Sequence, residues 1–473
     1  MTTQGTRTEH DSLGERQIPA DAYYGVQTLR AVENFPLSGI PLSSFPEFVK
    51  ALAIVKKACA LANHDLKNLE VEKRDAIVAA CDEILDGKLH DQFPVDMIQG
   101  GAGTSTNMNA NEVIANRGLE LLGRRKGEYG FLHPNDDVNR SQSTNDSYPT
   151  AVKIGIAREA LASADAIHGL RNAFEAKATE FAEVLKMGRT EEQDAVPMTL
   201  GQEFHAYATM IEDARLRLRE AGLLLLHVNQ GATAIGTGIN SPPGFADAVV
   251  ARLCEISLLP IKCAGDLVEA TQDAGSFLHM SAALKRAAVQ ISKICRDLRL
   301  MSSGPRCGLG EIRLPSLQPG SSIMPGKVNP VIPEVVNQVC YQVIGNDVTV
   351  TMAAEAGVLE LNAMEPIMAL SLFQSVRLLR NACRILAEKC IRGIVADEER
   401  CRAYVYGSIG IVTALNPVLG YEKSAAIAKE ALATGGRVYD LVLEKGWMTK
   451  EALDDVLRPE RMTQPRNLVV TPS

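Results

Sequence analysis

The chain has 473 residues and a net charge of −8, with 46% hydrophobic and 22% charged residues. This balance is typical of a globular protein, and the length suggests about two to four domains. No long basic block offsets the negative charge, which argues against nucleic acid or an anionic membrane as a partner. An anionic ligand would therefore need a local cluster of hydrogen-bond donors.

The cysteines and the N-terminal segment favour a reducing compartment. The ten cysteines form no Cys-x-x-Cys pair, and most lie in apolar stretches. A disulfide framework or a zinc site would need closer, paired spacing. The N-terminal segment is polar and lacks the apolar core of a secretory signal, and no window of about 18 residues is continuously apolar. The sequence therefore predicts reduced thiols, no metal site and a cytoplasmic location.

Helical periodicity dominates the chain after its first 142 residues, which mix shorter helical patterns with Pro- and Gly-rich loops. In residues 149–187, apolar side chains recur at three-, four- and seven-residue steps, and Gly188 stands at the position of a helix C-cap. Strand signals are scarce. Comparable helical stretches cover residues 200–228, 266–302, 333–357 and 366–394.

Helices of this length are not stable alone and need neighbours along their length. Five of them predict an all-α fold with a central bundle, and helices that are apolar on several faces predict packing between subunits. We expect three domains: an N-terminal mixed helical domain at residues 1–142, the long-helix bundle at 143–397, and a small C-terminal helical domain at 398–473.

Two segments rich in hydroxyl and amide groups precede predicted helices. Residues 100–107 (GGAGTSTN) follow no predicted strand and lack the third glycine of a dinucleotide-binding turn, so that motif is rejected. Residues 141–146 (SQSTND) come just before Pro149. Either segment can simply cap a helix. One cap needs a single such residue, however, and the second segment supplies five in six positions.

Two later segments are also candidates. Residues 188–194 (GRTEEQD) could be a solvated charged turn between helices. Residues 320–330 (GSSIMPGKVNP) are not a phosphate-binding loop, because five residues separate Gly320 from Gly326 and Val328 replaces the metal-binding hydroxyl residue. Met324 precedes a proline and should be extended, which predicts an open loop, and Asn329 could cap the next helix.

Together these segments predict a site for a small dicarboxylate. Helix N-termini carry unpaired N–H groups and a partial positive charge, so they bind carboxylates. Serine and threonine hydroxyls are short donors, and Lys327 supplies one full charge. The eight histidines are scattered, and none are paired at metal-ligand spacing.

Residues 320–330 closely resemble the signature loop of the aspartase/fumarase superfamily, and the other three segments match that family's motifs in the same order. The resemblance covers nearly the whole chain, from residues 20–25 (ADAYYG) to Asn416-Pro417. It implies a homotetramer with 222 symmetry, active sites that each combine residues of three subunits, and a mobile loop that closes over the substrate. It also implies catalysis without an organic cofactor.

The resemblance further implies a role for each site residue. Ser321 would be the general base that takes a proton from the carbon next to the substrate's β-carboxylate. The product of that step would be an aci-carboxylate dianion. The remaining groups would bind the β-carboxylate (Thr104, Ser143, Thr144 and Ser322), the α-carboxylate (Lys327 and Asn329) and the amino group (Asn145 and Thr190).

Local features favour the branch that releases ammonia from L-aspartate over fumarate hydratase. These are Thr144 in the second motif, residues 331–338 (VIPEVVNQ) after the loop, and the Met364-Glu365 pair. Gly326, in contrast, is more typical of the hydratases. Glu191 stands where the family has Gln or His, and its role stays open. A non-enzymatic structural protein is a third alternative, which would predict a damaged loop.

Overall fold

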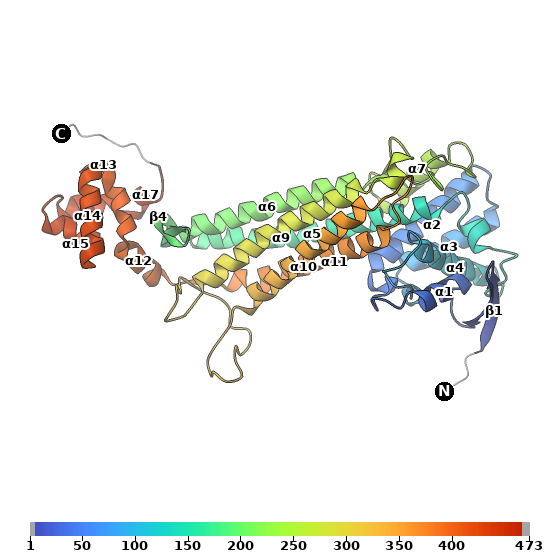
Figure 1. Cartoon of the computed structure of the whole chain (residues 1–473), viewed down its shortest axis with the longest axis horizontal. Coiled ribbons are helices and arrows are strands. Elements are labelled where there is room, and N and C mark those ends of the chain that lie inside the picture. The colour runs from blue at the N-terminus through green and yellow to red at the C-terminus, as the bar shows by residue number, and fades with distance from the viewer. Residues whose placement is uncertain (1–4, 466–473) are drawn as a thin grey trace. The chain divides into compact units, whose positions relative to one another are not determined.

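The computed structural model describes residues 5–465 and is mainly helical (Figure 1). The all-α fold class is confirmed, with only small two-stranded sheets in this part of the chain. The five long helices are present: α5 (Thr144–Glu180), α6 (Leu200–Leu224), α9 (Gly275–Met301), α10 (Val331–Glu355) and α11 (Glu365–Lys389).

These helices contact one another as a bundle (Figure 1). Phe174 of α5 packs on Phe204 of α6 with ring centroids 6.0 Å apart. Between α9 and α10, the Asp347 carboxylate accepts hydrogen bonds from Ser281 Oγ at 2.8 Å and Lys285 Nζ at 2.6 Å. Asn346 of α10 donates to Ser375 Oγ of α11 at 3.0 Å. Buried and partly buried polar pairs of this kind add directional contacts to the apolar packing between the helices.

The remaining helices are shorter. The N-terminal part contains α1 (Val26–Asn34), α2 (Pro46–Asp65), α3 (Val71–Leu85) and α4 (Thr104–Leu121), and α7 (Phe245–Ser257) follows α6. The stretch 266–302, expected as one helix, is divided into α8 (Glu269–Gln272) and α9. The C-terminal part contains α12 (Glu398–Gly407), α14 (Tyr421–Thr434), α15 (Val438–Glu444) and α16 (Lys450–Val456).

The predicted helix at 149–187 was wrong at both ends. It begins five residues earlier, at Thr144, with Pro149 inside the helix, and it ends at Glu180. Strand β3 (Leu185–Thr190) then pairs antiparallel with β4 (Gln193–Thr199), so Gly188 lies in a strand and caps no helix. Leu185 and Met187 alternate along β3 and join an apolar core with the C-terminal helices, and this tertiary packing overrides the helical pattern.

The turn between β3 and β4 consists of Glu191 and Glu192, because Thr190 pairs with Gln193. Both glutamates have left-handed backbones, with φ of 53° and 63°. Two left-handed residues in a row fit the twist of a tight hairpin, although Asn and Gly adopt them more easily. The charged link expected at 188–194 is therefore a tight β-hairpin, with Thr190 at the end of its first strand.

The chain divides into two compact units. The first comprises residues up to Asp165, Ala214–Ala288 and Cys340–Arg380, and the second comprises Ala166–Asp213, Val289–Val339 and the residues from Asn381 onward. The boundary between the two units crosses each of the five long helices once, so all five contribute residues to both units. The division into three domains stays a prediction.

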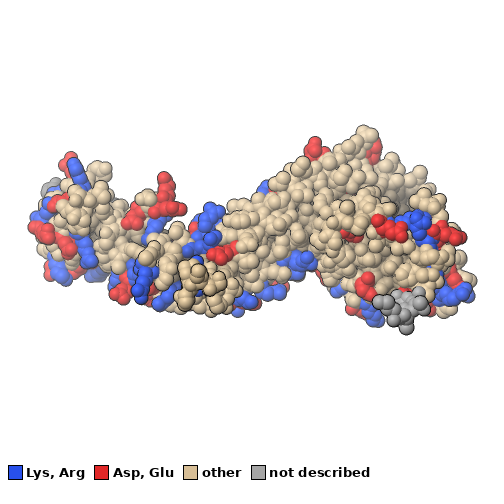
Figure 2. Space-filling view, turned by 60° about the horizontal axis from the view of Figure 1, so that its bottom comes forward, with Lys and Arg blue, Asp and Glu red and all other residues tan. Residues whose placement is uncertain are grey.

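The surface charges and the free thiols agree with what the sequence predicted, namely no long basic block and reduced cysteines. Acidic and basic side chains are interspersed on the face drawn in Figure 2. Cys59, Cys81, Cys340 and Cys401 are buried free thiols, and burial raises the pKa of Cys340 to about 12.

Among the described residues, no helix is both long and apolar enough to cross a membrane.

Candidate active site

The first motif, residues 100–107, forms the start of α4. Gly103 precedes the helix with a φ of +89°, and a Cβ at this position would lie 2.4 Å from the ring of Tyr148 in α5. Only glycine therefore allows the start of α4 to pack this closely against α5. Thr104 is the first residue of α4 and is exposed, and its hydroxyl donates to Gly101 O at 2.7 Å.

The second motif is held in shape by the buried carboxylate of Asp146. Its Oδ1 accepts from Ser143 N at 2.9 Å, and its Oδ2 accepts from Gly231 N at 3.1 Å and Thr233 N at 2.9 Å. Burial raises the pKa of Asp146 to about 6, and these N–H groups oppose that shift because they favour the charged form. Asp146 is thus an acceptor that fixes the backbone at the start of α5.

Asn145 connects α5 to a segment that the sequence reading missed. Pro149 has no N–H to donate to Asn145 O, and Asn229 Nδ2 donates to that oxygen at 3.0 Å instead. The Asn145 side chain donates through Nδ2 to Ala234 O at 2.7 Å. The sequence signal for this segment was Gly231, within a Gly- and Thr-rich stretch. In the structure Gly231 has a positive φ.

A hydrogen bond joins the two motifs. Asn107, in the first turn of α4, donates through Nδ2 to Thr144 Oγ1 at 3.2 Å, and both side chains are buried. The structure therefore brings together the starts of α4 and α5, which carry four of the predicted residues: Thr104, Ser143, Thr144 and Asn145. Two adjacent helix N-termini with hydroxyl side chains provide donors for an anion.

The other predicted residues belong to the second unit. Thr190 is exposed at the end of β3. Its neighbour Arg189 donates to the fully buried Glu311 carboxylate at 2.8 Å, and Lys186 of the same strand lies 3.9 Å from that carboxylate. These charges anchor the hairpin below Thr190, so the position of Thr190 depends on a buried ion pair.

The signature loop is closed at its neck and open at its tip. Gly320 N donates to Lys327 O at 2.7 Å, and Asn329 Nδ2 donates to Gly320 O at 2.8 Å. A Cβ at Gly320 would lie 2.7 Å from Lys327 O and 2.8 Å from Asn329 N, so the neck requires glycine. Ser322 and Lys327 are exposed on the loop, as the predicted open conformation requires.

Ser321 lies just inside this neck. Its Oγ accepts hydrogen bonds from Ile323 N at 3.2 Å and from Met324 N at 3.0 Å. Two N–H groups directed at one hydroxyl oxygen favour its ionised form. The local backbone thus supplies part of the stabilisation that a serine base needs.

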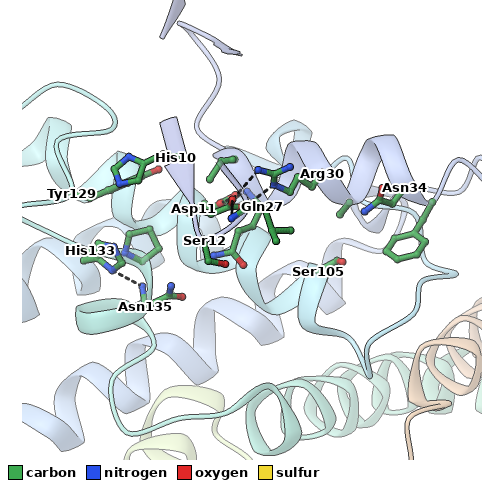
Figure 3. Close-up of a pocket in the computed structure, with 16 residues that line it drawn as sticks. His10, Asp11, Ser12, Gln27, Arg30, Asn34, Ser105, Tyr129, His133 and Asn135 are labelled. Carbon is green, nitrogen blue, oxygen red and sulfur yellow. Dashed lines mark hydrogen bonds and ion pairs between the residues drawn. The ribbon is translucent and has the colours of Figure 1, made fainter. Parts of the chain in front are cut away.

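Two cavities lie near these segments. One of about 650 Å³, beside α1 in the first unit, contains Ser105 of the first motif but none of the predicted site residues (Figure 3). The positive charge of Arg30 in this cavity is balanced by Asp11 at 2.7 Å. A second cavity of about 290 Å³ borders the base of the signature loop and includes Asn329 and Arg400.

Comparison with known proteins places the chain in a family. Residues 14–345 match the lyase family, and residues 411–464 match the family described as fumarase C C-terminus. Aspartate ammonia-lyase of Escherichia coli (strain K12) is 56% identical over 97% of this chain and 96% of its own length.

Solved structures agree with this match. The fumarate lyase:delta crystallin from Brucella melitensis, in a cobalt-bound crystal structure, is 58% identical, with a TM-score of 0.95 over 97% of this chain and 100% of that one. A class II fumarase from Schistosoma mansoni is 36% identical, with a TM-score of 0.92 over 98% of this chain and 100% of that one. The chain therefore belongs to the lyase family, within the aspartase/fumarase superfamily that its motifs resemble.

Replacing Asp146 with Asn should destabilise the protein. An amide has only one acceptor oxygen, so its NH₂ group would face an N–H donor on one side of the site, and we expect a loss of about 1–3 kcal/mol. The free energy of unfolding, measured in urea, tests this. Asp82, a half-exposed carboxylate on α3, offers a matched control in Asp82→Asn. Equal stability of Asp146→Asn and the wild type would refute the anchoring role.

Proposed function

We propose that this protein catalyses the reversible removal of ammonia from L-aspartate to give fumarate. The main support is the 56% identity with an aspartate ammonia-lyase over nearly the whole of both chains, against 36% with the class II fumarase. All four motifs of the resemblance are present, including an undamaged signature loop with Ser321, Lys327 and Asn329. An undamaged loop speaks against the purely structural alternative.

In this proposal the β-carboxylate of the substrate binds at the starts of α4 and α5. Ser143 and Thr144 contribute hydroxyls there, Thr104 contributes its hydroxyl by exchanging its hydrogen bond to Gly101 O for one to the substrate, and the two helix N-termini add a partial positive charge. Ser322 of the signature loop is the fourth hydroxyl residue proposed to bind this carboxylate. Donors fixed in advance lower the barrier if they bind the developing dianion more tightly than the ground state.

Ser321 acts as the base in this scheme. Its alkoxide takes the proton from the substrate carbon next to the β-carboxylate, and the electron pair of that C–H bond enters the carboxylate to form the aci-carboxylate dianion. The pair then returns to form the C=C bond while the C–N bond breaks and ammonia leaves. The two N–H groups on Ser321 Oγ support this role because they stabilise the alkoxide.

The other end of the substrate is assigned to Lys327, Asn329, Asn145 and Thr190. Lys327 provides an exposed ammonium group for the α-carboxylate. Asn329 uses one N–H on Gly320 O, and its second N–H is the one proposed to bind the carboxylate. Asn145 donates through Nδ2 to Ala234 O, which directs the opposite atom, Oδ1, as an acceptor for the substrate's ammonium group. These side chains supply the base and the donors, and we infer that no organic cofactor is required.

We further propose that the protein is a cytoplasmic homotetramer in which three subunits contribute to each active site, as the resemblance implies. An apolar stripe on α10 supports subunit association. Tyr341, Val348 and Met352 recur at helical spacing and are 54%, 58% and 69% exposed. Side chains of this kind on one helix face are typical of a surface that packs against another subunit.

The substrate can be tested directly. Purified protein given L-aspartate should form fumarate, detected by its ultraviolet absorbance, and the same protein given L-malate should form little or none. Malate as the only productive substrate would support the hydratase alternative, and no turnover of either acid would contradict the proposal.

Replacing Ser321 with Ala should lower kcat by about 10²–10⁴-fold, because no group remains to take the proton. Steady-state kinetics with L-aspartate measure this, with the molecular mass checked in parallel. Ser316→Ala, at an exposed serine before the loop neck, is a control that should keep wild-type activity. Substantial turnover by Ser321→Ala would exclude Ser321 as the base.

The assembly has its own test. Light scattering should give about four times the mass of the 51.0 kDa chain, and Val348→Glu with Met352→Glu should lower both the mass and the activity, because charges in an apolar interface are costly. Leu432→Glu, on α14 and 77% exposed, should leave both unchanged. A fully active monomer would refute shared active sites.

A further inference from the structure

A fully buried lysine lies behind the proposed carboxylate site. Lys56 of α2 is 0% exposed, and its Nζ donates to Asn107 Oδ1 at 2.6 Å, Gln142 Oε1 at 2.9 Å and Asn139 Oδ1 at 3.0 Å. Three acceptor oxygens match the three N–H donors of an ammonium group. A neutral amine has only two such donors, so one oxygen would face its lone pair. These contacts therefore favour the charged form of Lys56.

The contacts of Lys56 continue to the proposed ligand site. Because Asn107 turns its Oδ1 to Lys56, its Nδ2 carries the donors, which bond to Asn139 Oδ1 at 3.1 Å and to Thr144 Oγ1 at 3.2 Å. A hydroxyl oxygen that accepts this bond is oriented to donate its own hydrogen elsewhere. Gln142 extends the network, since its Oε1 also accepts from Ser147 Oγ of α5 at 3.0 Å.

We propose that Lys56 is a positioning residue for the carboxylate-binding site at the starts of α4 and α5. Its ammonium group orients Asn107, which in turn orients the Thr144 hydroxyl toward the substrate's β-carboxylate. The buried positive charge also favours an anion at this position, because buried charges are weakly screened. This inference rests on the proposed function, since it takes Thr144 to be a ligand of the substrate.

The charge of Lys56 should make dicarboxylate binding depend on pH. The groups that face it are Asp146 on α5, Cys59 on α2 and Cys81 on α3; burial raises the pKa of both thiols, which keeps them neutral. Burial lowers the pKa of Lys56 to about 8, and the Asp146 charge opposes that shift. Lys56 is charged below this pH and neutral above it, so the affinity for a dianion should fall as the pH rises through about 8.

The test uses the full-length protein and succinate, a dicarboxylate with no amino group. Calorimetry should give a wild-type Kd that rises above pH 8. Lys56→Met removes the charge at similar length, and we expect its Kd at pH 7 to be about tenfold higher than in the wild type and constant from pH 7 to 9.5. The neighbouring Lys57, which pairs with Asp82 and not with Asn107, gives the matched control Lys57→Met, which should behave as the wild type.

A second variant separates positioning from simple structural support. Asn107→Leu breaks the link to Thr144 while Lys56 remains, and the double variant with Lys56→Met should bind succinate no more weakly than the weaker single variant. If Lys56→Met does not fold, the wild-type pH profile and its change in Asn107→Leu decide the question. A wild-type Kd independent of pH, a folded Lys56→Met with wild-type affinity, or additive effects in the double variant would each overturn the inference.

These outcomes are distinct from a failure of the proposed function. A protein that converts L-aspartate to fumarate but binds succinate without any dependence on Lys56 would keep its function and lose this positioning role. A protein that binds succinate as described but does not act on L-aspartate would lose the proposed reaction.

Discussion

The arrangement of the candidate site depends on the contact between the starts of α4 and α5. In a chain with a net charge of −8, an anionic substrate has to be attracted locally, and these two helix ends supply the local donors. Gly103 permits the close packing against Tyr148, and the hydrogen bond from Asn107 to Thr144 joins the two helices. The hydroxyls can only act together because this contact fixes their backbones.

The signature loop follows a different principle. Its neck requires glycine at position 320, because a side chain there would clash with Lys327 O and Asn329 N. The residues from Ser322 to Val328, in contrast, are exposed. A closed neck holds Ser321 against the N–H groups of Ile323 and Met324 even while the tip is in solvent. The conformation around Ser321, the proposed base, is thus determined by local backbone contacts.

The sequence predicted the long helices well because a 3.6-residue apolar period over many turns has few alternatives. It missed β3, since two alternating residues, Leu185 and Met187, are too few to outweigh the helical pattern before them. It identified the hydroxyl-rich motifs but not Lys56, whose hydrogen-bond partner Asn107 lies 51 positions further along the chain. A contact between distant segments produces no periodic pattern in the sequence. The sequence sign of the contact between Lys56 and Asn107 was a lysine within a largely apolar helix.

The proposal assigns two kinds of positive charge to the two ends of the substrate. Lys327 is exposed on the loop, whereas Lys56 is fully buried behind Thr144. The proposed reaction gives a reason for this difference. Negative charge grows on the β-carboxylate as the aci-carboxylate forms, and the α-carboxylate keeps the same charge throughout. Stabilising a growing charge favours donors that are already oriented and shielded from water, because no reorganisation is then needed during the step. A fixed charge on the α-carboxylate needs only binding, for which a solvent-exposed lysine is sufficient.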